Sequence, residues 1–256
     1  MTDSPPVPAA THATTSLAGR MVNVLVAPGE TWEAVRTEGY RASNWVVPLL
    51  MGMIAGIVFI WGAFSQPGVV DEIMEQQGKA FDKLVAERRM TADQADKARE
   101  QMDFMRPTIV AVGRLAGSAG LAVMAVGMQF LIALLVSLIA RWGLGTALPY
   151  RKCMEITGLA GVIPALGMLV TLFLVVIKGS MTANLGPILL VSNGAVGGPL
   201  QAVLSALNLF NLWWCAALSG GTARLAGRSW GAAAAWIFGL YALITAGAAG
   251  IAALNS

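Results

Sequence analysis

Runs of about 20 apolar residues recur along this chain of 256 residues, and they constrain its fold more than any other feature. A helix of about that length crosses the hydrocarbon core of a bilayer. Hydrophobic residues make up 56% of the chain and charged residues only 12%, against about a quarter in soluble domains. The sequence therefore predicts an all-α, polytopic membrane protein embedded in a lipid bilayer.

The apolar runs predict five spans within one membrane domain, residues 44–256. The spans are expected at residues 44–65, 109–141, 154–177, 200–219 and 231–253. Pro164 interrupts the third span, because proline has no N–H with which to continue a helix. Residues 182–191 are apolar and uncharged, which is consistent both with a re-entrant segment and with an interfacial helix.

Residues 1–43 precede the first span and predict a disordered tail followed by a short helix. The helix around residues 30–40 carries Trp32 and Val35 on one side and charged residues around the rest. Such a helix is expected to lie on the membrane surface, with tryptophan at the interface. A solvated connector is the alternative.

A polar segment, residues 67–106, separates the first two spans and predicts an extramembrane helical hairpin. Thr91 and Gln94 form a capping box that starts its second helix, at about residue 92. Each helix has an apolar stripe. The stripes are expected to pack against each other, against the membrane surface or against a second protomer.

The fourth span, taken as one straight helix, carries polar side chains within about 60° of one another. They are Gln201, Ser205, Asn208, Asn211 and Ser219. In lipid such a face must turn toward protein or water. Gln129, in the middle of the second span, is expected to hydrogen-bond to a neighbouring helix. The face therefore fixes the packing of the fourth helix or lines a polar path.

Charged residues near the span ends are expected to tie the bundle together on its inner side. Glu155 begins the third span, and Arg224 and Arg228 lie between the fourth and fifth. A carboxylate at an interface with arginines on the same side usually pairs with them or stays hydrated. We therefore expect Glu155 to pair with Arg224 or Arg228.

Catalytic and metal-binding classes find no support in the sequence. The only histidine, His12, lies in the tail, and Cys153 and Cys215 have no ligand spacing around them. No GxSxG or HExxH motif is present. The net charge of +3 is spread along the chain, which does not favour nucleic acid. The sequence therefore predicts no catalytic residue, no metal site and no cofactor.

The basic residues favour an inside N-terminus and an outside C-terminus. With that orientation the inner segments carry eight basic residues, whereas the short outer connection carries Lys178 alone. The hairpin on the outer side has seven, but most lie far from the span ends, where the positive-inside rule counts them.

Three segments carry a family resemblance: APGETWEAVR at residues 27–36, YRKCMEITGLAGVIPAL at 150–166 and LNLFNLWWCAALSGGTARLAGRSWGAA at 207–233. Together they resemble the Yip (Ypt-interacting-protein) domain family, specifically its bacterial branch. The chain lacks the Asp-Leu-Tyr-Gly-Pro signature of the eukaryotic members, so a Rab-type GTPase contact is not expected. The resemblance implies a non-enzymatic protein of the bacterial cytoplasmic (inner) membrane.

Two functions fit these features. The first is a membrane scaffold or adaptor that organises membranes or unknown protein partners and forms a homo-oligomer. The second is a small transporter or channel with a polar path along the fourth span.

Overall fold

The computed structural model of the chain describes residues 16–180, 185–190 and 198–254, and every regular element in them is helical. The all-α prediction is therefore confirmed, while the predicted disordered tail lies outside the described residues. The α-helices are α1 (Leu17–Val26), α2 (Pro28–Thr37), α3 (Ser43–Ala63), α4 (Pro67–Ala86), α5 (Ala92–Phe104), α6 (Arg106–Leu138), α7 (Tyr150–Ala160), α8 (Val162–Lys178), α9 (Gly198–Ala206), α10 (Leu209–Ala226) and α11 (Trp230–Leu254). A π-helix η1 (Ile139–Gly143) extends α6, and a 3-10 turn η2 (Pro187–Leu190) lies within the connection at 182–191.

Four helical segments are long and apolar enough to cross a membrane: α3, α6 with η1, α7 with α8, and α11. The pair α9 and α10 is a fifth if the two helices together form one broken span. The polytopic bundle is thus confirmed. Residues 181–184 and 191 lie outside the described residues, so the path of the connection at 182–191 stays a prediction.

The third span bends at Gly161, between α7 and α8. Pro164 has no N–H to donate to the carbonyl of Ala160, four residues earlier, so the regular helix stops there. The predicted interruption therefore lies one turn before the proline. Both helices pack against α3 and α10, and α7 also packs against α6.

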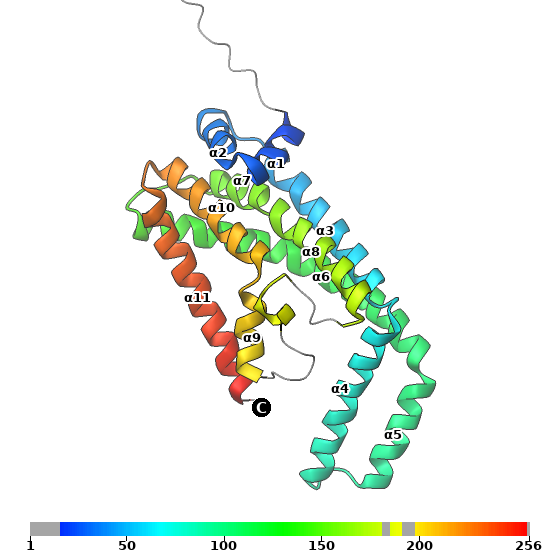
Figure 1. The fold of residues 1–256 in the computed structure, drawn as a ribbon. Helices are drawn as coiled ribbons and strands as arrows, with labels where there is room; N and C mark the ends of the chain where they lie inside the picture. Colours follow the sequence, from blue (N-terminus) through cyan, green and yellow to red (C-terminus); the bar gives the residue numbers. More distant parts are fainter. Residues whose placement is uncertain (1–15, 181–184, 191–197, 255–256) are drawn as a thin grey trace, which may run out of the picture.

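The hairpin is formed by α4 and α5, which extend away from the other helices in Figure 1. The predicted capping box of Thr91 and Gln94 is present, with both of its hydrogen bonds. An ion pair joins Arg99 of α5 to Asp82 of α4, and a second joins Arg106, the first residue of α6, to Asp71 of α4. At the base of the hairpin, Val69 is buried in a cluster with residues of α3 and α8. The hairpin is therefore anchored at its base and braced along its length.

Helices α1 and α2 pack on one end of the bundle, above α7 and α10 (Figure 1). Trp32 of α2 is only 1% exposed, and its ring lies so close to Gly221 of α10 that a Cβ there would be 3.2 Å from the ring. Val35 is also buried. Protein therefore covers the apolar face of α2, while the position of this helix relative to the membrane surface stays a prediction.

Candidate functional site

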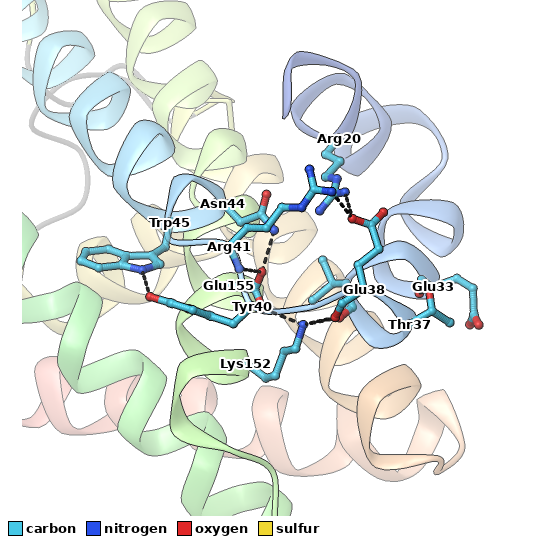
Figure 2. Close-up of polar contacts among 11 residues, drawn as sticks. Arg20, Glu33, Thr37, Glu38, Tyr40, Arg41, Asn44, Trp45, Lys152 and Glu155 are labelled. Carbon is cyan, nitrogen blue, oxygen red and sulfur yellow. Dashed lines mark hydrogen bonds and ion pairs between the residues drawn. The ribbon is translucent and has the colours of Figure 1, made fainter. Parts of the chain in front are cut away.

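A buried carboxylate, Glu155, lies near the start of α7 and has no exposed surface. One of its oxygens, Oε1, accepts hydrogen bonds from the backbone N–H of Arg41 at 3.0 Å and from Nδ2 of Asn44 at 2.7 Å. The ammonium of Lys152 lies 2.9 Å from the other oxygen, Oε2. Figure 2 shows these groups converging on the carboxylate from the N-terminal end of α3 and from α7.

Lys152 extends this centre to the connection between α2 and α3. Besides the ion pair with Glu155, its Nζ donates to the backbone carbonyls of Val35 at 2.7 Å and Glu38 at 2.9 Å. The ammonium thus makes two hydrogen bonds to backbone carbonyls and one charge contact with a carboxylate. The lysine charge therefore joins α7 to the end of α2 and to the residue that follows it.

A second carboxylate, Glu38, pairs with two arginines beside the first centre. Arg41 lies 2.8 Å from Glu38, and Arg20 of α1 pairs with the same oxygen. The Arg20 side chain is only 1% exposed. A buried charge is stable only when it is paired and hydrogen-bonded. We therefore regard these three cations and two carboxylates, with the amide of Asn44, as one network. We call it the inner polar cluster, and its members are Arg20, Glu38, Arg41, Asn44, Lys152 and Glu155.

The geometry of the inner polar cluster fits a structural tie between α1, α3 and α7. Both oxygens of Glu155 are engaged, and the whole side chain is enclosed by protein. Among the described residues, no three His, Cys, Asp or Glu side chains lie close enough to hold a metal ion. The contacts of Arg20 with Glu38, of Glu155 with Arg41 and Asn44, and of Lys152 with Val35 and Glu38 join separate helices or connections, so the cluster fixes how one end of the bundle is closed.

The predicted pairing of Glu155 with Arg224 or Arg228 is wrong. Nε of Arg224 lies 2.7 Å from Glu33 of α2, and Nε of Arg228 donates to the carbonyl of Leu144 at 3.0 Å. Helix α10 continues to Ala226, so Arg224 lies on its last turn, within reach of α2. The hydrogen bond from Arg36, and then that from Arg224, lower the pKa of the Glu33 carboxyl below its usual value.

The fourth span contains a second polar site, because it is broken rather than straight. Helices α9 and α10 meet at an angle of 54°, and Asn208 is the N-cap of α10. Its Oδ1 accepts from the backbone N–H of Asn211 at 2.9 Å, and its Nδ2 donates to the carbonyl of Ser205 at 3.1 Å. The asparagine therefore satisfies backbone groups on both sides of the break.

Asn211 and Tyr241 complete the break. Nδ2 of Asn211 donates to the carbonyl of Ala206 at 3.2 Å and to the Tyr241 hydroxyl at 3.0 Å. The Tyr241 hydroxyl, from α11, donates to the same carbonyl at 2.7 Å. The N–H of Leu209 donates to the carbonyl of Leu185 at 2.8 Å. These contacts supply partners to several of the backbone groups that the break frees, as a bent helix in a membrane requires.

The predicted polar face is therefore wrong as one continuous stripe. Gln201 and Ser205 lie on α9, Ser219 lies on α10, and the two helices do not share an axis. Ser219 donates to the carbonyl of Cys215 on its own helix at 2.7 Å. Gln129 of α6 donates to the carbonyl of Met154 at 3.2 Å and to the Thr157 hydroxyl at 2.8 Å, both on α7.

Residues 22–252 of the chain match the Yip1 domain family, and they include the broken span, the hairpin and every residue of the inner polar cluster except Arg20. The chain belongs to the Yip1 domain family. No curated protein and no solved structure matches it. The Yip resemblance drawn from the sequence is confirmed, while membership of a bacterial branch stays a prediction.

Sequence reasoning missed three residues of the inner polar cluster, Asn44, Arg20 and Glu38. Asn44 stands just before an apolar run, where an asparagine is typical of a helix cap. Arg20 gave the better signal, because it is the one charge within the apolar stretch LAGRMVNVLV. A single arginine there predicts a carboxylate partner, although the sequence does not say which one.

Replacing Asn208 with alanine is expected to destabilise the Yip1 domain by about 0.5–2 kcal/mol, the usual loss for an N-cap. The variant removes both printed contacts of the Asn208 side chain. Ser205→Ala is the matched control, because only the backbone carbonyl of Ser205 takes part in the break. Unfolding in detergent, followed by tryptophan fluorescence, measures both. Equal stability of Asn208→Ala and the parent would contradict the capping role.

Proposed function

We propose that this Yip1-domain protein is a non-enzymatic scaffold or adaptor of the bacterial cytoplasmic membrane, and that its α4–α5 hairpin contacts a partner protein. The observation that carries the proposal is the hairpin itself. Helix α4 has 20 residues, or about 30 Å of helix, and it extends away from the bundle in Figure 1. An arm of this length presents a surface beyond the membrane-spanning helices.

The hairpin has the stiffness that a docking surface requires. Arg99 pairs with Asp82 across the two helices, and Arg106 pairs with Asp71 nearer the bundle. The hydrogen bond that Arg99 donates to the Asp82 carboxylate is the main cause that raises the pKa of Arg99. At the end of α5, Phe104 is 87% exposed, so an aromatic ring is available beside these charges. Aromatic and arginine side chains are the residues most enriched at protein interfaces.

The contacts of the intramembrane polar groups also favour a scaffold over a transporter. The Asn208 and Asn211 side chains bind backbone groups at the break and the hydroxyl of Tyr241. Gln129 binds α7. Polar groups used in this way hold helices together, as in other membrane bundles.

We further propose that the N-terminus is cytoplasmic and the C-terminus and hairpin are outside. Arg224 contacts Glu33 of α2, and Arg228 contacts Leu144 beside η1. Basic residues thus gather at the end of the bundle that α1 and α2 cover, opposite the hairpin. This distribution supports the orientation by the positive-inside rule.

Crosslinking from the hairpin of intact cells tests both proposals. Gln76→Cys and Glu100→Cys place a thiol on the exposed surface of α4 and α5, while both native cysteines are buried. With a membrane-impermeant thiol–amine crosslinker, both variants are expected to give one discrete adduct larger than the chain. The control, Gly231→Cys, puts an exposed thiol at the inner end of α11 and should stay unreacted.

The possible results separate the two proposals. Reaction of Gly231→Cys but not of the hairpin variants would contradict the orientation. Reaction at the hairpin without any protein adduct would contradict the scaffold role. An adduct of twice the chain's mass would identify the partner as a second copy.

A further inference from the structure

A groove of about 410 Å³ lies between α3, α6 and the α7–α8 pair. Pro48 and Gly52 line it from α3, Met124 and Met128 from α6, and Gly158 and Met168 from α7 and α8. A Cβ added to Gly52 would meet no atom within 4 Å, so this wall of the groove is open space. Met124 is 62% exposed, which shows that the groove opens to the outside of the bundle.

The surface of the groove is apolar. Gln129 is the one lining side chain able to form hydrogen bonds, and its amide nitrogen already donates to Met154 and Thr157 of α7. Methionine side chains are flexible and adapt to irregular apolar shapes. Since all three walls belong to membrane-spanning segments, the medium at the open side is the hydrocarbon of the bilayer.

Aromatic rings mark the end of the groove nearest α1 and α2. The rings of Trp45 and Phe130 meet edge to face, with their centroids 6.0 Å apart. Nε1 of Trp45 donates to the Tyr40 hydroxyl at 2.9 Å, and the Tyr150 hydroxyl donates to the carbonyl of Phe130 at 2.9 Å. Tryptophan and tyrosine of this kind are enriched where the hydrocarbon meets the headgroups.

A cation stands just beyond these rings. The guanidinium of Arg151 lies 5.7 Å from the centre of the Tyr40 ring. Arg151 precedes Gly158 of the groove by seven residues, which is two turns or about 10 Å along the same face of α7. Within the described part of the chain, no carboxylate forms an ion pair with Arg151. The apolar floor of the groove therefore leads to an exposed positive charge.

We propose that this groove binds an anionic phospholipid, with one acyl chain along Gly52 and Gly158 and the phosphate at Arg151. The surrounding bilayer supplies the lipid. The apolar groove matches the acyl chain, and the guanidinium of Arg151 matches the phosphate of the headgroup. Basic pockets between transmembrane helices bind anionic headgroups because the charges attract each other near the membrane surface. This site is separate from the hairpin and does not depend on the scaffold role.

Lipid binding by the purified full chain tests the proposal. In mild detergent, phosphatidylglycerol is expected to raise the Tm of the protein more than phosphatidylcholine of the same acyl chains. Arg151→Gln should weaken phosphatidylglycerol binding about fivefold and leave phosphatidylcholine unchanged. Gly52→Leu, which fills the groove, should abolish the retention of either lipid in native mass spectrometry.

Two control variants make the same substitutions, Arg to Gln and Gly to Leu, at positions outside the groove. Arg141→Gln removes an exposed arginine that does not line the groove, and Gly239→Leu adds bulk to an open position on α11. Both should bind like the parent. Equal binding of the two lipids would overturn the headgroup assignment, and lipid retention by folded Gly52→Leu would overturn the groove assignment. A Tm shift by inorganic phosphate equal to that by phosphatidylglycerol would overturn the lipid as ligand.

Discussion

Replacing Glu155 with alanine is expected to destabilise the protein by about 3–5 kcal/mol, the usual loss when one partner of a buried ion pair is removed. The change leaves the buried ammonium of Lys152 without its counter-charge. It also leaves the N–H of Arg41 and the amide of Asn44 without their acceptor. Unfolding of the full chain in detergent by a denaturing surfactant, followed by tryptophan fluorescence, measures the loss.

A double-mutant cycle separates the interaction energy of the Glu155–Lys152 pair from the other losses that each substitution causes. Lys152→Met alone leaves a buried carboxylate with only neutral donors, whereas Glu155→Gln with Lys152→Met removes both charges together. The double variant is therefore expected to lose less than the sum of Glu155→Gln and Lys152→Met. Strict additivity would contradict the pair. Glu75→Ala, which breaks the exposed pair with Lys79, should cost under about 1 kcal/mol.

Gly158→Ala is expected to give the second large effect, a loss of about 1–3 kcal/mol from overpacking. A Cβ on Gly158 would lie 2.2 Å from Cα of Trp45 and 2.9 Å from the carbonyl oxygen of Asn44. These are backbone atoms of α3, so relief requires the whole helix to move. That movement also pulls Asn44 away from Glu155, so the cost includes part of the inner polar cluster.

Gly52→Ala is the matched control for Gly158→Ala. It makes the same change on a neighbouring helix, at a position where the new methyl group meets nothing within 4 Å. Alanine has a helix propensity better than that of glycine by about 1 kcal/mol, so this variant should be as stable as the parent or more stable. Thermal unfolding in detergent compares the two. Equal Tm values for both variants would show that α3 and α7 tolerate separation.

Local features of the sequence predicted much of the fold. The apolar runs locate the membrane helices, because span length follows from bilayer thickness. The capping box at Thr91 starts α5, and Pro164 marks the bend between α7 and α8. Each of these signals acts within a few residues of where it stands in the chain, which is why the sequence alone reveals it.

The sequence around the break in the fourth span contains a helix-cap pattern, but the high hydropathy of the run favours reading it as one straight span. Asn208 is followed three residues later by Asn211, the spacing of an N-cap and the backbone N–H that it binds. In an apolar run long enough to span, the same residues also fit one face of a straight helix. Their contact with Tyr241 of α11, 30 residues further on, favours the bent form.

The inner polar cluster could not be predicted from local patterns. Asn44 and Glu155 are separated by 111 residues, and Lys152 binds Glu38 from 114 residues away. The charge of each residue was visible, but its partner depends on which helices become neighbours. The nearby arginines, Arg224 and Arg228, were equally plausible partners until the place of α2 was known.

The position of Trp32 has a consequence for the order in which the protein assembles. A chain is synthesised from its N-terminus, so α1 and α2 are made first. The surfaces that cover them are made later, and Gly220 and Gly221, which receive the Trp32 ring, are among the last. Helices α1 and α7 also pack against α2, but the part of its apolar face that α10 covers stays exposed until α10 is made. Helix α2 is therefore made well before the helix that completes its packing.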